Sequence, residues 1–159
     1  MDAASTTSER GFNINLSART ISIAVLVFAI GVSGYLSYLK LSNEKAFCVA
    51  GETFDCGTVL NSVYSEVGGV PIAYLGLATN LIVISLLLLE DRISLLAANN
   101  VLLVFGIVLF AFLFSMYLIY VQAELIGSFC PWCLSHEAAI SVLFALSSWR
   151  LYKFFTEPI

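Results

Sequence analysis

Four long apolar runs dominate the sequence. They cover about residues 21–39, 70–89, 97–121 and 131–151, and each is close to the ~20 residues that cross a ~30 Å hydrocarbon layer as a helix. The chain is 60% hydrophobic and 11% charged, whereas a soluble domain is about half apolar and a quarter charged. A soluble core of this size cannot enclose so much apolar surface. The runs therefore predict an all-α membrane protein, a bundle of four transmembrane helices.

The runs leave room for one compact domain. We expect residues 1–18, which are polar and short of large hydrophobes, to be a flexible N-terminal segment, and residues 19–155 to form a single four-span domain. The first run is longer than the apolar stretch of a signal peptide, so it is predicted to be retained. Between the first two runs, residues 58–66 have apolar side chains at helical spacing. They predict a short helix on the mouth of the bundle.

The basic residues predict the orientation of the bundle, because Lys and Arg concentrate in the cytoplasmic segments of membrane proteins. Two of them, Lys40 and Lys45, follow the first run, whereas the other five fall on the opposite side of the bundle. Both termini are then cytoplasmic in the cell membrane, and the loop 40–69 and the turn 122–129 face outward. Basic residues scattered in this way form no stripe, which argues against nucleic-acid binding. The five on the opposite side are Arg10, Arg19, Arg92, Arg150 and Lys153.

All four cysteines lie on the predicted outer side, in two close pairs. Cys48 and Cys56 lie in the outward loop, and Cys130 and Cys133 stand in a C-P-W-C sequence at the start of the fourth run. Cys130 can cap a helix that begins at Pro131, where free N–H groups and the helix dipole stabilise a thiolate. A thiolate is the attacking species in disulfide exchange. The C-P-W-C sequence therefore favours a redox site over a structural disulfide or inert thiols.

Other uses of the cysteines stay open at this point. Spacing alone does not determine which cysteines pair, and Cys48 with Cys56 could simply staple the loop. A zinc site needs four converging thiolates or imidazoles, and the spacing of the loop pair is not the usual zinc-finger one, so no metal is expected. Beside a C-x-x-C on the same face, a relay is favoured, because each dithiol carries the two electrons that a quinone accepts. Cys56 could then reach Cys130, and Cys48 would face a soluble partner.

Two ionisable residues follow the C-P-W-C sequence. His136 and Glu137 lie three and four residues after Cys133, on the same helix face. Ionisable side chains inside a span are costly and are functional candidates by default. They could relay protons to a quinone or lie in the wet headgroup region, and the sequence leaves both readings open. Polar residues expected to form hydrogen bonds at helix ends or between helices are Asn99, Asn100 and Gln122.

The ordered combination of these elements resembles the vitamin K epoxide reductase family in its prokaryotic form. The resemblance rests on Cys48-x7-Cys56, the following stretch GTVLNSVYSEVGGVPIAYLG and the C-P-W-C that opens the last span, and it covers about residues 21–151. The bacterial four-helix enzyme that recharges the periplasmic thiol oxidant has its C-x-x-C first, so the order here argues against that family. The resemblance implies an enzyme that oxidises a thioredoxin-fold partner outside the membrane and reduces a membrane quinone of the menaquinone or ubiquinone type.

The resemblance also implies roles for the cysteines. Cys130 and Cys133 match the active-site pair of the family, and Cys133 is the one expected to contact the quinone ring. Cys48 and Cys56 match the loop pair, and a Cys56–Cys130 disulfide is the expected intermediate. Many prokaryotic members carry the partner fused at the C-terminus. Because this sequence ends soon after the last span, we expect no fused thioredoxin-like domain and a separate partner protein.

Three further residues receive quinone-binding roles from the resemblance. Ser62 matches a serine expected to form a hydrogen bond near the quinone, and Tyr64 matches an aromatic residue of some members. Glu137 stands where animal members have a tyrosine that lines the pocket. That departure weakens the case for epoxide reduction and for anticoagulant sensitivity.

Three rival functions remain after this reading. The first is a non-catalytic membrane protein whose disulfides staple its outer face. The second is a quinone or epoxide reductase that runs mainly in the reductive direction, since direction depends on redox potentials that a sequence does not contain. The third is a metal carrier, which a metal assay under reducing conditions would test.

Overall fold

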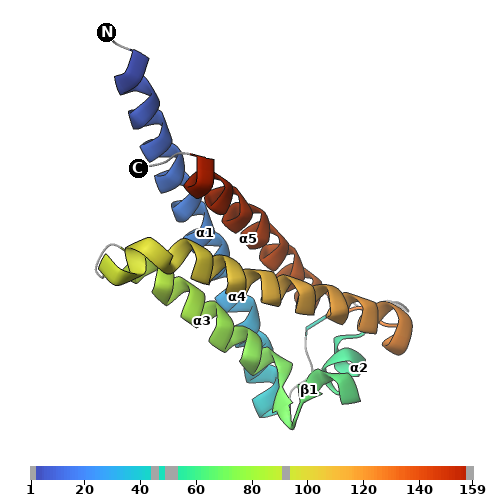
Figure 1. Ribbon diagram of the computed structural model, residues 1–159. Helices are drawn as coiled ribbons and strands as arrows, with labels where there is room; N and C mark the ends of the chain where they lie inside the picture. Colours follow the sequence, from blue (N-terminus) through green and yellow to red (C-terminus); the bar gives the residue numbers. More distant parts are fainter. Residues whose placement is uncertain (1–2, 44–46, 49–53, 91–93, 157–159) are drawn as a thin grey trace.

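The computed structural model describes residues 3–43, 47–48, 54–90 and 94–156, and these are mainly helical (Figure 1). The long helices are α1 (Ala3–Ser42), α3 (Ile72–Leu89), α4 (Ser94–Tyr120) and α5 (Pro131–Thr156). A π-helical turn, η2 (Val121–Ile126), continues α4. Between α1 and α3 lie a short helix α2 (Cys56–Leu60), a 3-10 turn η1 (Val63–Ser65) and an antiparallel hairpin of β1 (Glu66–Val67) and β2 (Val70–Pro71).

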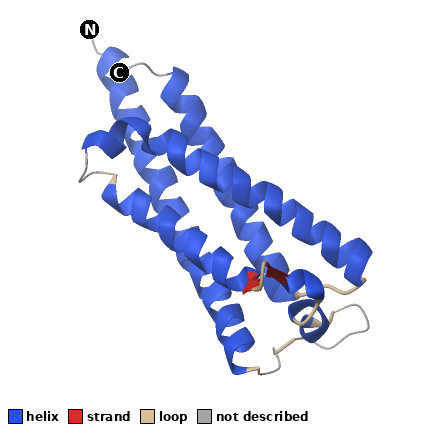
Figure 2. Cartoon of the chain, turned by 60° about the horizontal axis from the view of Figure 1, so that its bottom comes forward, coloured by secondary structure: helices blue, strands red, loops and turns tan. Residues whose placement is uncertain are grey.

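The four long helices pack in a ring. Helix α1 contacts α3 and α5, and α4 contacts the same two helices from the other side. Both chain termini lie at one end of the ring, whereas α2 and the β1–β2 hairpin lie at the opposite end (Figures 1 and 2). The connections that carry the cysteines therefore gather at the end away from the termini. We call this end the mouth.

Three of the described helical segments are long and apolar enough to cross a membrane: Ala18–Ser42, Ile72–Leu89 and Asn99–Ile126. Large apolar side chains on the outside of the ring, such as Val27 and Leu113, are more than half exposed, as expected for a surface that lipid covers. These features indicate a membrane protein. Helix α5 has 26 residues, but its hydroxyl and ionisable side chains make it more polar, so a fourth crossing stays a prediction.

The ends of several elements differ from those expected. Helix α1 begins at Ala3, so residues 3–18, which we expected as a flexible segment, are helical in the structure. The outer loop contains two short turns, α2 and η1, where one helix over residues 58–66 was expected. The reason for the early start of α2 is its cap: the Asp55 carboxylate accepts hydrogen bonds from the Thr58 N–H at 3.1 Å and the Thr58 hydroxyl at 2.7 Å.

The half of the ring near the termini is filled with aliphatic side chains. Two arginine side chains at this end are paired: the Arg19 guanidinium donates to the Leu87 carbonyl at 2.8 and 3.1 Å, and Arg150 binds Glu90 at 2.8 Å. Leu87 is 1% exposed. This half therefore serves as the packed core of the bundle, made of Leu26, Val83, Leu87, Val104, Val108, Ile140 and Leu143.

Candidate redox site

The four cysteines meet at the mouth. Cys48 and Cys56 form a disulfide, with their Cα atoms 6.2 Å apart, whereas Cys130 and Cys133 are free thiols. Cys56 and Cys130 are both fully buried and belong to one apolar cluster with Val32, Leu36 and Val59. Cys48 and Cys133 pack against the edge of this cluster. The two pairs that the sequence analysis singled out are thus parts of a single site.

A main-chain contact aligns the two pairs. Phe54 and Phe129 form a parallel β-bridge, and the Asp55 N–H donates to the Phe129 carbonyl at 3.2 Å. Cys56 directly follows Asp55 and Cys130 directly follows Phe129, so the bridge places Cys56 beside Cys130. Sequence analysis missed this bridge, because a single pair of residues leaves no periodic pattern.

Cys130 occupies the N-terminal cap of α5, as the C-P-W-C sequence predicts. Its carbonyl accepts from the Leu134 N–H at 2.9 Å, and its Sγ accepts from the Cys133 N–H at 3.3 Å. The side-chain oxygen of Gln122 accepts the Cys130 N–H at 2.9 Å. A hydrogen bond from the Cys133 side chain is the main cause that lowers the pKa of the Cys130 thiol. Burial raises this pKa, and hydrogen bonds from the backbone N–H groups of Cys133 and Trp132 lower it further. The position therefore favours a thiolate.

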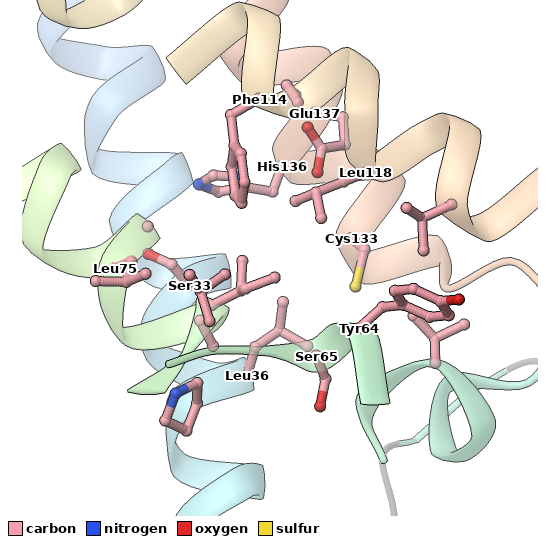
Figure 3. A pocket seen from close by; sticks show the side chains of 18 of the residues that line it. Ser33, Leu36, Tyr64, Ser65, Leu75, Phe114, Leu118, Cys133, His136 and Glu137 are labelled. Carbon is pink, nitrogen blue, oxygen red and sulfur yellow. The ribbon is translucent and has the colours of Figure 1, made fainter. Parts of the chain in front are cut away.

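A cavity of about 370 Å³ lies under the mouth, between the four long helices. Cys133, His136 and Glu137 line it from α5, and Tyr64 and Ser65 line it from the mouth segment opposite (Figure 3). Cys133 lines this cavity, whereas Cys130 is buried in the cysteine cluster. The C-P-W-C pair thus has one thiol beside the loop cysteines and the other beside the cavity. Most of the remaining wall is apolar, including Leu36, Leu75, Phe110, Phe114, Leu118 and Ile140.

The residues predicted to bind a quinone all line this cavity. They are Ser62, Tyr64 and Glu137. The Ser62 hydroxyl donates to the Val59 carbonyl at 2.9 Å, and the Tyr64 side chain is 39% exposed. Glu137 is buried. These side chains come from two different walls, so a ligand in the cavity would contact both.

His136 is held by a polar pair that the sequence analysis did not single out. Its Nε2 atom lies 3.0 Å from the Asn80 side-chain nitrogen, which also donates to the Ser33 hydroxyl at 3.4 Å. Asn80 and Ser33 are both at least nine-tenths buried. An amide in the middle of an apolar run was the signal that could have pointed to Asn80, because such a group needs a buried partner.

Ser115 is a second residue that the sequence analysis missed. It is 3% exposed and lines the cavity from α4. Its hydroxyl has no hydrogen-bond partner within the part of the chain that the structure describes. A buried polar atom without a partner is destabilising. The side-chain oxygen of Asn100 is also unpartnered among the described residues, but of the two only Ser115 lines the cavity. Of the expected hydrogen-bonding residues, Gln122 binds Cys130 and Asn100 donates to the Leu86 carbonyl at 3.3 Å.

Metal ligands do not converge among the described residues. No group of three or more His, Cys, Asp or Glu side chains in those ranges could hold a metal ion. Two of the four cysteines are joined in a disulfide and so offer no thiolate.

Comparison with known proteins agrees with this arrangement. The sequence is 36% identical over 121 residues to the thiol-disulfide oxidoreductase LTO1 of Arabidopsis thaliana, which is 72% of this chain and 32% of that protein. The chain therefore spans about a third of the length of that relative. The profile of the vitamin K epoxide reductase family matches residues 20–148. This match includes the four cysteines and every residue that lines the cavity, and the chain belongs to the vitamin K epoxide reductase family.

Proposed function

We propose that the chain is a membrane thiol–disulfide oxidoreductase that takes electron pairs from a thioredoxin-fold partner and passes them through its two cysteine pairs to a quinone. One observation carries the proposal: a disulfide and a dithiol lie in one cluster, and the dithiol borders an apolar cavity. The mouth faces the outside of the membrane in this proposal. The positions of Arg19 and Arg150 at the opposite end support that orientation.

The proposed relay begins at the loop pair. A partner thiolate attacks Cys48, which is less buried than Cys56, and the partner leaves as a disulfide while Cys48 and Cys56 become thiols. Cys56 then attacks Cys130 in the oxidised C-P-W-C pair, and Cys133 departs as a thiolate. Finally Cys48 attacks Cys56, which restores the loop disulfide and releases Cys130. The end of this sequence has the same bonding as the structure, with one disulfide and one dithiol.

The cavity residues fit a quinone. Its volume of about 370 Å³ lies within the ~300–1,000 Å³ of small-molecule sites, and its walls are mainly apolar with a few polar groups. A quinone, when bound, supplies a two-electron acceptor that also takes up two protons. Cys133 would contact its ring, and Ser62 and Tyr64 would bind it from the mouth. The unpartnered hydroxyl of Ser115 is the observation that favours a ligand with a polar oxygen.

Ser115 and Glu137 lie at the same depth in the cavity. Ser115 comes seven residues before Gln122, and Glu137 comes seven residues after Cys130. Gln122 and Cys130 are hydrogen-bonded, and α4 and α5 run antiparallel (Figure 1), so both side chains lie about 10 Å below that bond. This polar level would bind the quinone oxygen farther from the thiols.

Proton transfer in the proposed reaction uses α5. Glu137 and His136 both line the cavity one turn beyond Cys133. The hydrogen bond from Asn80 fixes the imidazole of His136 against α3. These two groups hold protons within reach of the cavity, while the apolar walls exclude water.

The test is quinone reduction driven by a reduced thioredoxin-fold protein, with the full chain in detergent micelles. Cys56→Ser and Cys130→Ser should each reduce turnover to background, because each removes a sulfur atom of the relay. Ser135→Ala is the matched control, since its hydroxyl donates only to the Pro131 carbonyl of its own helix, at 2.8 Å. Undiminished turnover in either cysteine variant would remove the relay.

A further inference from the structure

The loop that carries Cys48 and Cys56 is attached to the start of α5 at two points. Beside Cys56, the Asp55 N–H donates to the Phe129 carbonyl at 3.2 Å. Beside Cys48, the Trp132 indole N–H donates to the Phe47 carbonyl at 2.9 Å. The first attachment point, Phe129, directly precedes Cys130, and the second, Trp132, lies within the C-P-W-C sequence. The loop disulfide thus lies between two attachments to the other cysteine pair.

The attachment at Phe47 depends on two side chains. The Trp132 ring packs on Tyr35 of α1, with centroids 5.0 Å apart and planes inclined by 56°. The Tyr35 hydroxyl in turn accepts from the Phe47 N–H at 3.4 Å. The Phe47 side chain itself is 80% exposed. Because that side chain adds almost no packing, the described contacts that hold Phe47 are the hydrogen bonds to its main chain.

The two arms of the disulfide are therefore held differently. Cys56 is 1% exposed, begins α2 and lies beside a main-chain bridge in which no side-chain atom takes part. Cys48 is only partly buried, and the neighbouring Phe47 is held by the Trp132 and Tyr35 side chains. In a cycle that breaks and reforms the loop disulfide, Cys56 keeps its position. Cys48 is the cysteine whose sulfur atom has to return to bonding distance of Cys56.

We propose that Trp132 is a positioning residue that presents Cys48 to Cys56, and so favours the Cys48–Cys56 disulfide over the Cys56–Cys130 disulfide. This inference rests on the proposed relay for its purpose, although the contacts that carry it are independent of any partner or quinone. The second variable position of the C-P-W-C sequence then acts on the loop pair. Trp132 raises the effective concentration of Cys48 near Cys56 when the Cys56–Cys130 disulfide is resolved.

The step that Trp132 favours is a disulfide exchange without net oxidation. The Cys48 thiolate attacks Cys56 in the Cys56–Cys130 disulfide, a Cys48–Cys56 bond forms, and the Cys56–Cys130 bond breaks. The electron pair of the broken bond leaves with Cys130 as a thiolate. The step needs no further oxidant or reductant.

The first test isolates the loop pair. With Cys130 and Cys133 both replaced by Ala, the Cys48–Cys56 disulfide is equilibrated with glutathione, and the remaining thiols are trapped and counted by mass spectrometry. Trp132→Phe, which keeps an aromatic ring against Tyr35 but lacks the N–H donor, should lower the equilibrium constant for forming the disulfide by about 2- to 12-fold, the range for one hydrogen bond. Tyr35→Phe should shift it in the same direction by less, because its bond is longer.

The matched control is Trp149→Phe, on the same helix at the far end, where the indole is 51% exposed. It should leave the equilibrium unchanged. A Trp132→Phe value equal to that of the control would overturn the inference, and Tyr35→Phe gives an independent reading if Trp132→Phe folds poorly. Neither result depends on turnover.

The second test reads the exchange itself. In a Cys133→Ala background, the remaining three cysteines equilibrate between the Cys48–Cys56 and Cys56–Cys130 disulfides. Adding Trp132→Phe should raise the share of the Cys56–Cys130 form relative to Trp149→Phe in the same background. If the Cys56–Cys130 form is absent from every variant, the proposed relay fails, whereas the first test still decides the role of Trp132.

Discussion

The same four helices build two different interiors. Toward the termini, leucine, valine and isoleucine side chains from all four fill the space between them. Toward the mouth, the same helices enclose a cavity of about 370 Å³. The difference lies in residue size, because Ser33, Ala73 and Gly76 line the cavity where larger side chains would close it. One half of the bundle thus holds the fold together and the other half leaves room for a ligand.

The buried polar groups of the two halves differ in what surrounds them. Near the termini, Arg150 and Glu90 bind each other and Arg19 donates to the Leu87 carbonyl. The side-chain oxygen of Asn100 in this half is buried without a partner among the described residues. Around the cavity, the hydroxyl of Ser115 is buried without a partner among the described residues. Both groups are destabilising while they lack a partner, but of the two only Ser115 lines the cavity, where a ligand could supply one. The comparison predicts that stability and ligand binding respond to different substitutions.

The largest expected effect is on stability, from Leu87→Ala in the filled half. Leu87 is 1% exposed and central to the aliphatic core, so its loss should reduce the free energy of unfolding by about 2–5 kcal/mol. The measurement is unfolding in mixed micelles with increasing denaturing detergent. The neighbouring Leu88, which is 54% exposed, supplies the control Leu88→Ala. Equal losses in the two variants would contradict the assignment of this half as the core.

Filling the cavity in the hollow half should weaken ligand binding and leave stability almost unchanged. A side chain at Gly76 would meet only the His136 ring, at 3.7 and 3.9 Å from the added Cβ, and a leucine would extend into the cavity. Gly76→Leu should weaken the binding of a short-chain quinone about 5-fold or more, given ~1–3 kcal/mol for overpacking, with little change in unfolding. Binding is measured by titration calorimetry in detergent.

The control for this substitution is Gly31→Leu, on the exposed side of α1, where no atom lies within 4 Å of the added Cβ. Its quinone affinity should match that of the unaltered chain. If Gly76→Leu also binds quinone normally, the cavity is not the quinone site.

The filled half was easier to predict from the sequence than the hollow half. Apolar runs of about 20 residues indicate helices directly, and the match to Ile72–Leu89 is close. The position of the four cysteines at one end of the bundle could also be predicted. Successive runs cross in opposite directions, so the segments that carry the cysteines end at the same side. A helix such as α5, with Glu137 and Arg150 inside it, is less clear, since composition alone cannot tell a polar span from a surface helix.

A quinone pocket near Ser62, Tyr64 and Glu137 was expected from the family resemblance, but the other walls of the cavity and the attachments of the loop could not be predicted. The bridge between Phe54 and Phe129 and the bond from Trp132 to Phe47 join residues more than 70 positions apart. Contacts of this kind depend on how the helices pack, and they leave no pattern within either segment. Ser115 stood in an apolar run, and only the structure shows that its hydroxyl borders a cavity.

A smaller effect is expected from Ser115→Ala. Because the Ser115 hydroxyl has no partner among the described residues, its removal should leave the free energy of unfolding unchanged or slightly higher. Quinone affinity should fall by about 2- to 12-fold if that hydroxyl binds the ligand, the range for one hydrogen bond. The comparison is with Ser141→Ala, whose hydroxyl donates to the Glu137 carbonyl of its own helix at 2.9 Å. A loss of stability without a loss of affinity would show that Ser115 belongs to the packed core.

The last prediction concerns the rim of the hollow half, where Cys130 meets Cys133. The hydrogen bond from the Cys133 side chain is the main cause that lowers the pKa of the Cys130 thiol. Cys133→Ala removes that donor, so the pKa of Cys130 should rise, whereas Cys133→Ser keeps a hydroxyl donor and should hold it lower. With Cys48 and Cys56 also replaced by Ala, Cys130 is the one cysteine left in both variants, and the ultraviolet absorbance of its thiolate gives the pKa directly. At a pH between the two values, the serine variant should be the more reactive toward a small disulfide. Identical titration curves would mean that the cap of α5 alone stabilises the thiolate, and that the second cysteine matters only for the cavity.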